Sequence, residues 1–296
     1  MKNVLITGAN SYVGDSLKRW LLQYSSEYSV DIVDTISENW IKKDFTKYDV
    51  VFNVAGIAHA DVGNVSEETE KLYYSVNTDL AVKIAEKAKA SNVKQFIFMS
   101  SMIIYSGVEV VNETTQPNPE NFYGDSKLQA DIKIRELESE SFKVAIIRPP
   151  MIYGYGSKGN YKQLSKIASK LPFFPKVNNK RSMIYINNFC NFVKLLIDNE
   201  DRGVFFPQNG EYSNTSEIVK MIAEANNHKI IIIPGFNWFV NILKRCPGKI
   251  GKLTTKAFGN FAYDMSMSDY RAEYRVSTLS ESIILTECEG KEDAKQ

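Results

Sequence analysis

The sequence predicts an α/β protein built on a doubly wound parallel sheet. Short apolar runs alternate with stretches in which apolar residues recur at helical spacing, and this alternation is typical of a parallel sheet with helices on both faces. In the first unit, residues 2–7 read as a buried strand, residues 8–14 as a glycine-containing turn, and Val13 to Tyr24 as a helix. The apolar runs that we read as strands ending at one crevice are residues 2–7, 30–34, 49–56 and 93–101.

A pyrophosphate-binding turn is predicted where the first strand meets the first helix. Free backbone N–H groups and the positive end of the helix dipole point at this turn, provided that no side chain blocks close approach. Its middle position carries Ser11 where a glycine would be expected, and this serine could shift the phosphates or lend them a hydroxyl donor. The alternative is an ordinary strand–turn–helix. The residues assigned to a dinucleotide here are Gly8, Asn10, Ser11, Tyr12, Val13 and Gly14.

The second apolar run ends in a carboxylate. Asp34 could accept both hydroxyls of an adenosine ribose and would repel a 2′-phosphate, so it favours NAD over NADP without excluding NADP. The alternative is a solvated strand end. Asp44 and Phe45 end the next short segment, where a carboxylate and an apolar neighbour could bracket the adenine.

The next two strands bring small and polar residues to the same edge of the sheet. Small residues end the run at 49–56 and would let a cofactor lie close. The run at 93–101 ends in serines, and one long helical stretch at 67–90 separates the two runs. The residues assigned to the cofactor from this later part of the chain are Val54, Ala55, Gly56, Asn77, Ser100 and Pro149.

A tyrosine and a lysine four residues apart supply a candidate base. On a helix, Tyr123 and Lys127 lie on the same face, so the ammonium group can favour the ionised phenol. A tyrosine normally titrates near 10, which is too high for proton transfer at neutral pH without such a neighbour. Ser101 could hydrogen-bond the same substrate oxygen. This spacing alone is common by chance, and it gains weight from the dinucleotide pattern upstream.

With these motifs, the chain resembles an extended short-chain dehydrogenase/reductase of the NAD-dependent epimerase/dehydratase family, which works on nucleotide sugars. The resemblance covers roughly residues 1–235, and its motifs are residues 7–14, 53–56, 76–77, 100–105, 123–127 and 148–154. It implies that Tyr123 is the catalytic base, that Lys127 is its partner and a nicotinamide-ribose ligand, and that Ser101 is the second hydrogen-bond partner of the substrate hydroxyl. The chain departs from the family at Ser11 and in the short stretch between Asp34 and Asp44.

Substrate residues are expected in the second half of the chain. A glycine-rich turn at residues 156–161 precedes a helical run at 164–171 and suits an anion. The resemblance implies that Asn160 and Arg181 hold the diphosphate of a nucleotide sugar, with a surface arginine and a turn asparagine as the alternative. Phe174, or its neighbour, could cover a uracil ring or simply pack. Met102, which follows the catalytic serine, is also assigned to the substrate.

The expected domains interleave along the chain. Residues 1–150 with 183–209 form a Rossmann-type dinucleotide-binding domain, and residues 151–182 with 210–286 form a smaller C-terminal substrate-binding cap. The cap includes a helix at 211–227 with Thr215 or Ser216 as its N-cap. Residues 287–296 are charged and expected to fray.

Composition excludes several classes of function. The net charge is only +1 in 296 residues, so nothing indicates a nucleic-acid partner. The three cysteines and two histidines lack metal-ligand spacing, so no metal is expected, and the cysteines indicate a reducing, cytoplasmic compartment. Residues 1–7 already form a strand rather than a leader, and no stretch is long enough to span a bilayer. A homodimer is expected.

Residues 234–261 mix bulky apolar and basic residues. One interpretation is a cap helix with solvated lysines. The other is a peripheral contact with a membrane surface, because basic residues beside aromatic ones favour an anionic interface. That contact would fit an enzyme acting on a lipid-linked sugar diphosphate.

Two reactions and one non-catalytic role are compatible with a tyrosine base beside NAD, and a third reaction, dehydration, is disfavoured. A UDP-hexose or UDP-N-acetylhexosamine 4-epimerase, acting through a 4-keto sugar in surface polysaccharide biosynthesis, is the leading hypothesis, and an NAD(P)H-dependent 4-keto-sugar reductase is the next. A dehydratase would need a further acid/base pair after Ser101, where Met102 and Ile103 offer none. A non-catalytic NAD(P)-sensing protein stays as the outside alternative, because fold does not determine function.

Overall fold

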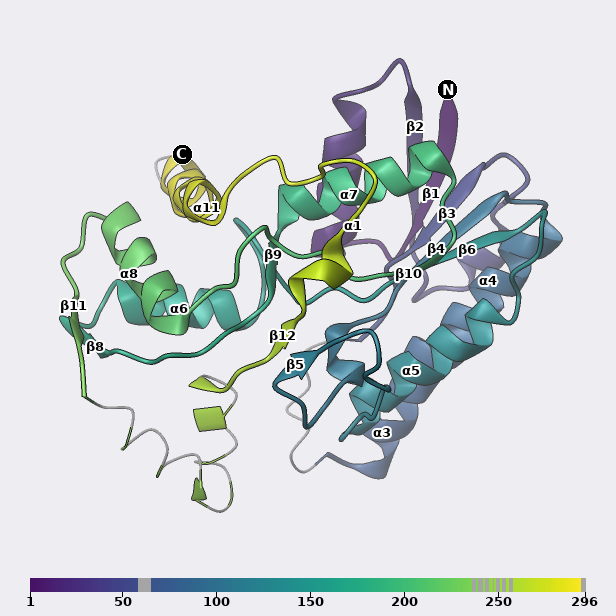
Figure 1. Cartoon of the computed structure of the whole chain (residues 1–296). Coiled ribbons are helices and arrows are strands. Elements are labelled where there is room, and N and C mark those ends of the chain that lie inside the picture. The colour runs from purple at the N-terminus through teal and green to yellow at the C-terminus, as the bar shows by residue number, and fades with distance from the viewer. Residues whose placement is uncertain are drawn as a thin grey trace.

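A six-stranded sheet lies at the centre of the larger half of the molecule (Figure 1). Its strands, in spatial order, are β10 (Gly203–Phe205), β6 (Lys143–Ile147), β4 (Gln95–Met99), β3 (Val50–Asn53), β1 (Lys2–Thr7) and β2 (Tyr28–Val33). All neighbouring strands are parallel. The strand order reverses on either side of β1, and ligands of such sheets bind at that switch point. The predicted doubly wound sheet is confirmed.

The computed structural model describes residues 1–57, 65–235 and 258–293, and between the last two ranges Trp238, Ile242, Arg245, Cys246, Gly248, Gly251, Thr254 and Thr255. The segment 234–261, for which a membrane contact is one interpretation, therefore lies partly outside the described residues. Helix α11 (Leu279–Asp293) includes residues 287–293, so this part of the expected frayed tail is helical.

Helices cover both faces of the sheet (Figure 1). Helices α1 (Tyr12–Leu22) and α7 (Ile186–Asn199) pack on one face, and α3 (Glu67–Tyr74), α4 (Ala81–Ala90) and α5 (Phe122–Arg135) cover the other. Strand β1 shows the reason. Successive side chains of a strand point to opposite faces, so Val4 and Ile6 join the first core cluster and Leu5 joins the second.

The helical stretch predicted at residues 67–90 is not continuous. A six-residue π-helix, η1 (Ser75–Leu80), separates α3 from α4 and contains the buried Asn77. Single-turn π-helices inside α-helices occur frequently at functional sites. Between β2 and β3 there is only the four-residue helix α2 (Asn39–Lys42), which agrees with the shortened stretch noted in the sequence.

The smaller half is a cap assembled from short elements (Figure 1, left). Its paired strands are β7 (Met151–Tyr153) with β9 (Met183–Tyr185), β8 (Phe173–Pro175) with β11 (Ile231–Ile233), and β5 (Val110–Val111) with β12 (Ala262–Tyr263). In the described part of the cap, the helices are α6 (Asn160–Ala168), α8 (Thr215–Ala225) and α11, with the 3₁₀ turn η3 (Met265–Ser268). The 3₁₀ turn η2 (Met102–Ile104) and strand β5 come from residues 1–150, the larger half, and β5 meets the cap by pairing with β12.

Two local sequence predictions in the cap were wrong. Helix α6 begins at Asn160 rather than at residue 164, directly after Gly159, whose φ of 110° a helix cannot continue. Helix α8 is capped by Asn214, whose side chain accepts the backbone N–H groups of Ser216 and Glu217, and not by the two hydroxyl residues that follow it.

A buried ion pair joins the catalytic helix to the rest of the fold. The guanidinium of Arg148, just after β6, donates two hydrogen bonds to the carboxylate of Asp131 on α5, at 2.8 and 3.0 Å. It also donates to the hydroxyl of Tyr105, and the backbone carbonyl of Arg148 accepts from Tyr263 of β12. The sheet, α5 and a cap strand therefore meet at one arginine.

We expect Asp131→Leu to destabilise the protein by about 3–5 kcal/mol, because it leaves the buried guanidinium without its carboxylate partner. The double variant Asp131→Leu/Arg148→Met should recover most of this loss. Glu67→Gln, which removes an exposed pair with Lys71, is the matched control and should cost less than about 1 kcal/mol. Urea unfolding measures all three. A double variant no more stable than the single one would contradict the assignment.

Candidate active site

The turn after β1 has the geometry that a pyrophosphate needs. Gly8 has φ of 109°, and a Cβ at this position would lie 2.8 Å from the backbone nitrogen of Ala55. Asn10 also adopts a left-handed conformation, with φ of 61°. The Ser11 hydroxyl accepts the backbone N–H of Gly14 at 3.3 Å and so caps helix α1. The unexpected serine therefore stabilises the helix start at which an anion would bind.

Of the residues predicted to contact the adenosine, the two aspartates are placed as carboxylates, whereas the ring of Phe45 is not available for the adenine. Asp34, directly after β2, accepts the backbone N–H groups of Ile36 and Ser37, and these bonds lower its pKa, so it is a carboxylate at neutral pH. Asp44 accepts from Thr46, which lowers its pKa as well. The ring of Phe45, however, is 1 % exposed and packs in the core, so it cannot lie against an adenine.

Three buried polar side chains at the carboxyl edge of the sheet lack protein partners. They are Thr7 at the end of β1, Asn53 at the end of β3 and Ser100 directly after β4. Thr7 and Asn53 are register partners, and both polar atoms of the fully buried Asn53 are unsatisfied. A buried polar group left unpaired costs about 1–3 kcal/mol. Thr7 and Asn53 lie in the family motifs but were not assigned to the site from the sequence, although each ends a strand at the crevice.

Lys127 is held deep at the same edge. Its side chain is 6 % exposed, and its ammonium donates to the backbone carbonyl of Met99 at 3.1 Å. A Cβ on Gly56 would lie 2.9 Å from the lysine nitrogen and 3.0 Å from the Asn77 side-chain oxygen. Asn77 in turn accepts the N–H of Ile57 and donates to Ser126 on α5. The glycine, the asparagine and the lysine thus form one packed unit.

The electrostatics of the tyrosine differ from the prediction. Burial raises the pKa of Tyr123 above its ordinary value, and the hydrogen bond with Ser101 offsets this in part. Lys127 does not lower the pKa of the phenol here; burial instead lowers the pKa of Lys127 itself to about 8. The Ser101 hydroxyl thus interacts with the phenol of Tyr123. That both groups contact one substrate oxygen stays a prediction.

The residues around the catalytic serine are fixed by backbone contacts. The Ser101 hydroxyl accepts the N–H of Ile103, and the N–H of the buried Met102 donates to the carbonyl of Pro149 at 2.9 Å. Ser100, the preceding residue, is bonded through its N–H to the end of β6. Backbone hydrogen bonds therefore hold the residues after β4 next to the residues at and after the end of β6, below the predicted site.

The candidate substrate residues lie on the cap. Asn160 is the first residue of α6, and Arg181 precedes β9, where its guanidinium donates to the carbonyl of Gly259 at 3.3 Å. Burial lowers the pKa of Arg181. Phe174 is buried against Phe258, so its ring packs in the cap core and does not cover a uracil.

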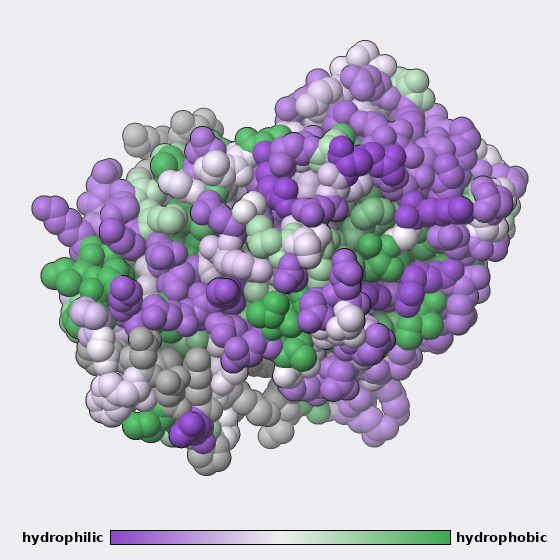
Figure 2. Space-filling model, viewed as in Figure 1, coloured by the Kyte–Doolittle hydropathy of each residue, from purple (hydrophilic) through white to green (hydrophobic). Residues whose placement is uncertain are grey.

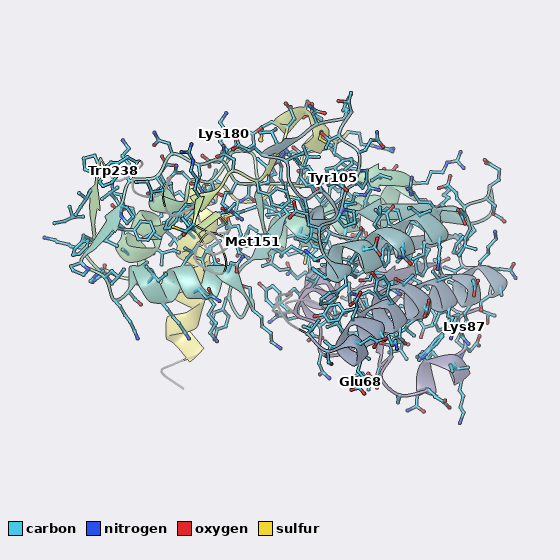
Figure 3. The ribbon with its side chains drawn as sticks, turned by 90° about the horizontal axis from the view of Figure 1, so that it is seen from below. Glu68, Lys87, Tyr105, Met151, Lys180 and Trp238 are labelled. Atoms are coloured by element: carbon cyan, nitrogen blue, oxygen red, sulfur yellow. The ribbon has the colours of Figure 1, made fainter. Side chains whose placement is uncertain are left out.

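The cap reaches the phosphate turn directly. Gly154, after β7, has φ of 152°, and a Cβ there would lie 2.6 Å from the hydroxyl of Tyr12. Figure 3 shows Met151 and Tyr105 in the middle of the molecule, between the cap residues Lys180 and Trp238 and the helices that carry Lys87 and Glu68. The start of the cap therefore lies against Tyr12 of the predicted phosphate turn.

The donor set fits a dinucleotide rather than a metal. In the part of the chain that the structure describes, no group of three or more histidine, cysteine, aspartate and glutamate side chains could hold a metal ion. A helix N-terminus, an ionised Asp34 and unsatisfied polar groups at a parallel-sheet switch point instead match the parts of NAD.

The chain belongs to the NAD dependent epimerase/dehydratase family, whose model matches residues 4–206. The resemblance read from the motifs is thereby confirmed, as is dependence on NAD or NADP at the level of the family. Members of this family catalyse different reactions, so membership alone does not give the reaction of this chain.

Two relatives and one solved structure illustrate the family. The chain is 30% identical over 291 residues to UDP-glucose 4-epimerase of Vibrio cholerae, covering 90% of this chain and 88% of the relative. It is 29% identical over 249 residues to N-acetyl-alpha-D-glucosaminyl-diphospho-ditrans,octacis-undecaprenol 4-epimerase of Escherichia coli O157:H7, covering 77% and 73%. The fold is similar to UDP-glucuronic acid 4-epimerase of Bacillus cereus in complex with NAD, with a TM-score of 0.74, 16% identity and coverage of 99% and 100%.

We expect Gly8→Ala to weaken NADH binding about tenfold or more, because a left-handed non-glycine residue costs about 1–3 kcal/mol and 1.4 kcal/mol is a factor of ten. The added methyl also meets the backbone at Ala55. Gly203→Ala is the matched control, since Gly203 has φ of 118° but open space around it, away from the crevice. Fluorescence titration with NADH measures both; equal affinities of the two variants would contradict the site.

The buried lysine also predicts a pH dependence of stability. The pKa of Lys127 falls from an ordinary 10.5 to about 8 on folding, so between pH 8 and 10 the unfolded chain binds the extra proton and the contribution of Lys127 to stability rises with pH. The free energy of unfolding of the wild type minus that of Lys127→Met should rise by about 1.4 kcal/mol per pH unit in this window. Urea unfolding of the cofactor-free protein at several pH values tests this, and parallel curves would refute it.

Proposed function

We propose that this protein is an NAD-dependent UDP-sugar 4-epimerase acting on a UDP-hexose or UDP-N-acetylhexosamine. The observation that carries the proposal is the contact of Ser101 with Tyr123 beside the buried Lys127, at the carboxyl edge of a dinucleotide-binding sheet. The Vibrio cholerae relative, a UDP-glucose 4-epimerase similar over nine-tenths of this chain, supports the same reaction.

In the proposed mechanism, Tyr123 takes the proton of the C4 hydroxyl and Ser101 holds the same oxygen. Bound NAD supplies the acceptor and later the donor of the C4 hydride. With the hydride and the proton removed, C4 becomes a ketone; after the sugar has rotated, the hydride would return to the opposite face of C4 and the proton would return from Tyr123 to the oxygen, which gives the epimer. The Ser101 hydrogen bond lowers the pKa of the phenol and so stabilises the phenolate that Tyr123 becomes during the proton transfer. Lys127, one helical turn further along α5, is proposed as a ligand of the nicotinamide ribose.

The cap would hold the nucleotide. We propose that Asn160, at the start of α6, and Arg181 bind the diphosphate, because a helix N-terminus and a guanidinium both suit phosphate oxygens. The substrate lies between the two domains, with residues 1–150 and 183–209 holding NAD and residues 151–182 and 210–286 holding the sugar nucleotide. Met102, which was assigned to the substrate from the sequence, is 3 % exposed and packs in a core cluster with Ile104 and Tyr105, so its side chain is not part of this proposal.

A 4-keto-sugar reductase is the second candidate. The four-residue helix α2 between β2 and β3 favours it, because a short crossover gives fewer contacts to the adenosine and a reductase must exchange its cofactor at each turnover. In that reaction Tyr123 would donate the proton to an existing ketone. A 4-epimerase of a lipid-diphosphate-linked sugar is the third, supported by the Escherichia coli relative.

We also propose a cytoplasmic homodimer that serves surface polysaccharide biosynthesis. The free cysteines Cys190, Cys246 and Cys288 suit a reducing compartment. Exposed Leu72 on α3 and Ile132 on α5 lie on neighbouring helices and suit a second copy of the chain. None of the helices that the structure describes is long and apolar enough to cross a membrane.

The reaction is tested by incubating the NAD-loaded protein with UDP-glucose or UDP-N-acetylglucosamine without a reductant. We expect the C4 epimer, detected by proton NMR, and a loss of about 10²–10⁴ in kcat in Tyr123→Phe because the base is removed. Tyr24→Phe, at the end of α1, is the control and should keep its activity. If product forms only from a 4-keto sugar supplied with NADH or NADPH, the protein is a reductase and the epimerase proposal is wrong. If Tyr123→Phe keeps full activity, the assignment of Tyr123 as the base is wrong.

A further inference from the structure

Acidic residues are distributed very unevenly along the chain. Residues 141–197 and 225–263 contain no aspartate or glutamate, although the whole chain has 35. The same two stretches carry sixteen of its 36 lysines and arginines. The net charge of +1 is therefore the sum of a positive charge on these two stretches and a negative charge on the rest of the chain.

The two acid-free stretches meet in the cap. Strand β8 of the first pairs with β11 of the second, and the guanidinium of Arg181 bonds to the carbonyl of Gly259. On the first stretch, Lys162 and Lys166 are exposed at i and i+4 of helix α6, and Lys170 follows them. In the described part of the cap, this leaves the exposed lysines Lys162, Lys166, Lys170, Lys176, Lys180 and Lys229, which give it a positive surface.

Two acidic side chains near this surface, Glu287 and Glu224, are already engaged. Glu287 of α11 accepts hydrogen bonds from Tyr161, Ser165 and Asn226. Glu224 of α8 pairs with Lys220 of the same helix. In the described part of the chain, the ion pairs do not include the exposed lysines of α6 or of the β8–β11 edge, so these keep their charge for a partner.

Large apolar side chains lie at the end of this cationic cap. Phe173 and Ile231 are register partners of β8 and β11 and are 57% and 68% exposed, whereas the next pair along the strands packs inward. Leu171 is exposed beside them. Figure 2 shows a hydrophobic patch at this end of the molecule, over β8 and β11. Because the two outward residues share one face, the patch is contiguous rather than scattered.

Further apolar side chains follow β11 in the chain. Trp238 is 65% exposed, and Figure 3 shows it at the same end of the molecule. Ile242, four residues later, is also exposed. We name the surface made by Leu171, Phe173 and Ile231, with the exposed Lys170, Lys176 and Lys229 around them, the cap tip.

We propose that the cap tip docks on an anionic membrane surface. Its apolar side chains enter the headgroup region while the lysines around them contact lipid phosphates, which is how peripheral proteins combine hydrophobic and electrostatic attraction. The inference goes beyond the proposed function and holds for each candidate reaction.

Sedimentation with vesicles tests the docking directly. The full chain should bind vesicles of phosphatidylglycerol and phosphatidylethanolamine at low salt. Its affinity for vesicles of phosphatidylcholine alone should be at least about tenfold lower, because each lysine near an anionic surface adds attraction. Phe173→Ser/Ile231→Ser should lower binding to the anionic vesicles about tenfold or more. Lys166→Gln/Lys170→Gln/Lys229→Gln should lower it and flatten its salt dependence.

A matched control and a fold check separate docking from misfolding. Leu22→Ser/Ile36→Ser removes two exposed apolar side chains of the dinucleotide-binding half and should bind vesicles like the wild type. All variants should keep wild-type NADH affinity and thermal unfolding, since the changed residues are exposed and outside the crevice. This readout also separates failure of the docking proposal from failure of the proposed function.

Three outcomes would overturn the proposal. They are absence of binding to anionic vesicles, equal binding to phosphatidylcholine, and wild-type binding by the Phe173→Ser/Ile231→Ser variant. Retention of the protein on immobilised poly-L-glutamate, without vesicle binding, would assign the surface to an acidic protein partner instead.

Discussion

The close approach of three chain segments at the carboxyl edge of the sheet is the constraint on which the candidate site depends. Gly8 lies against the backbone at Ala55, and Gly56 lies against the ammonium of Lys127, with no room for a Cβ at either place. These contacts connect the phosphate turn, the end of β3 and helix α5. A substitution that moves the phosphate turn is therefore expected to move helix α5, which carries Tyr123 and Lys127, as well. The lysine is buried as a result, which explains its lowered pKa.

The same helix is tied to the cap by the Arg148–Asp131 pair. Asp131 is fully buried and binds Arg148, whose backbone carbonyl accepts a hydrogen bond from Tyr263 of β12, so the helix that carries Tyr123 and the cap strand contact the same arginine. Buried ion pairs contribute little net stability, but they impose one geometry. The cap is therefore both a substrate-binding part and a part of the framework that orients the base. Its outer end, with lysines and exposed apolar residues, is free of that task and is available for a surface contact.

The sequence predicted the sheet, the phosphate turn and the Ser101/Tyr123/Lys127 set because each rests on local periodicity or on a short motif. It missed what depends on packing. The rings of Phe45 and Phe174 were assigned to ligands, but aromatic side chains next to a buried strand gain more free energy in the core. The pKa of Tyr123 follows burial rather than its lysine neighbour. Asn53 could have been noticed as a polar residue ending an apolar strand, but its lack of a partner is visible only in three dimensions.

The central claim is that the hydride taken from C4 returns to the same carbon. The most direct measurement uses UDP-glucose, or its N-acetylated counterpart, with deuterium at C4, incubated with the protein and an excess of unlabelled NAD. The account predicts that the epimer keeps its deuterium at C4, as read by NMR and mass spectrometry, because the nucleotide never leaves between the two hydride transfers. Loss of the label into free NADH, or incorporation of hydrogen from added NADH into the product, would contradict it.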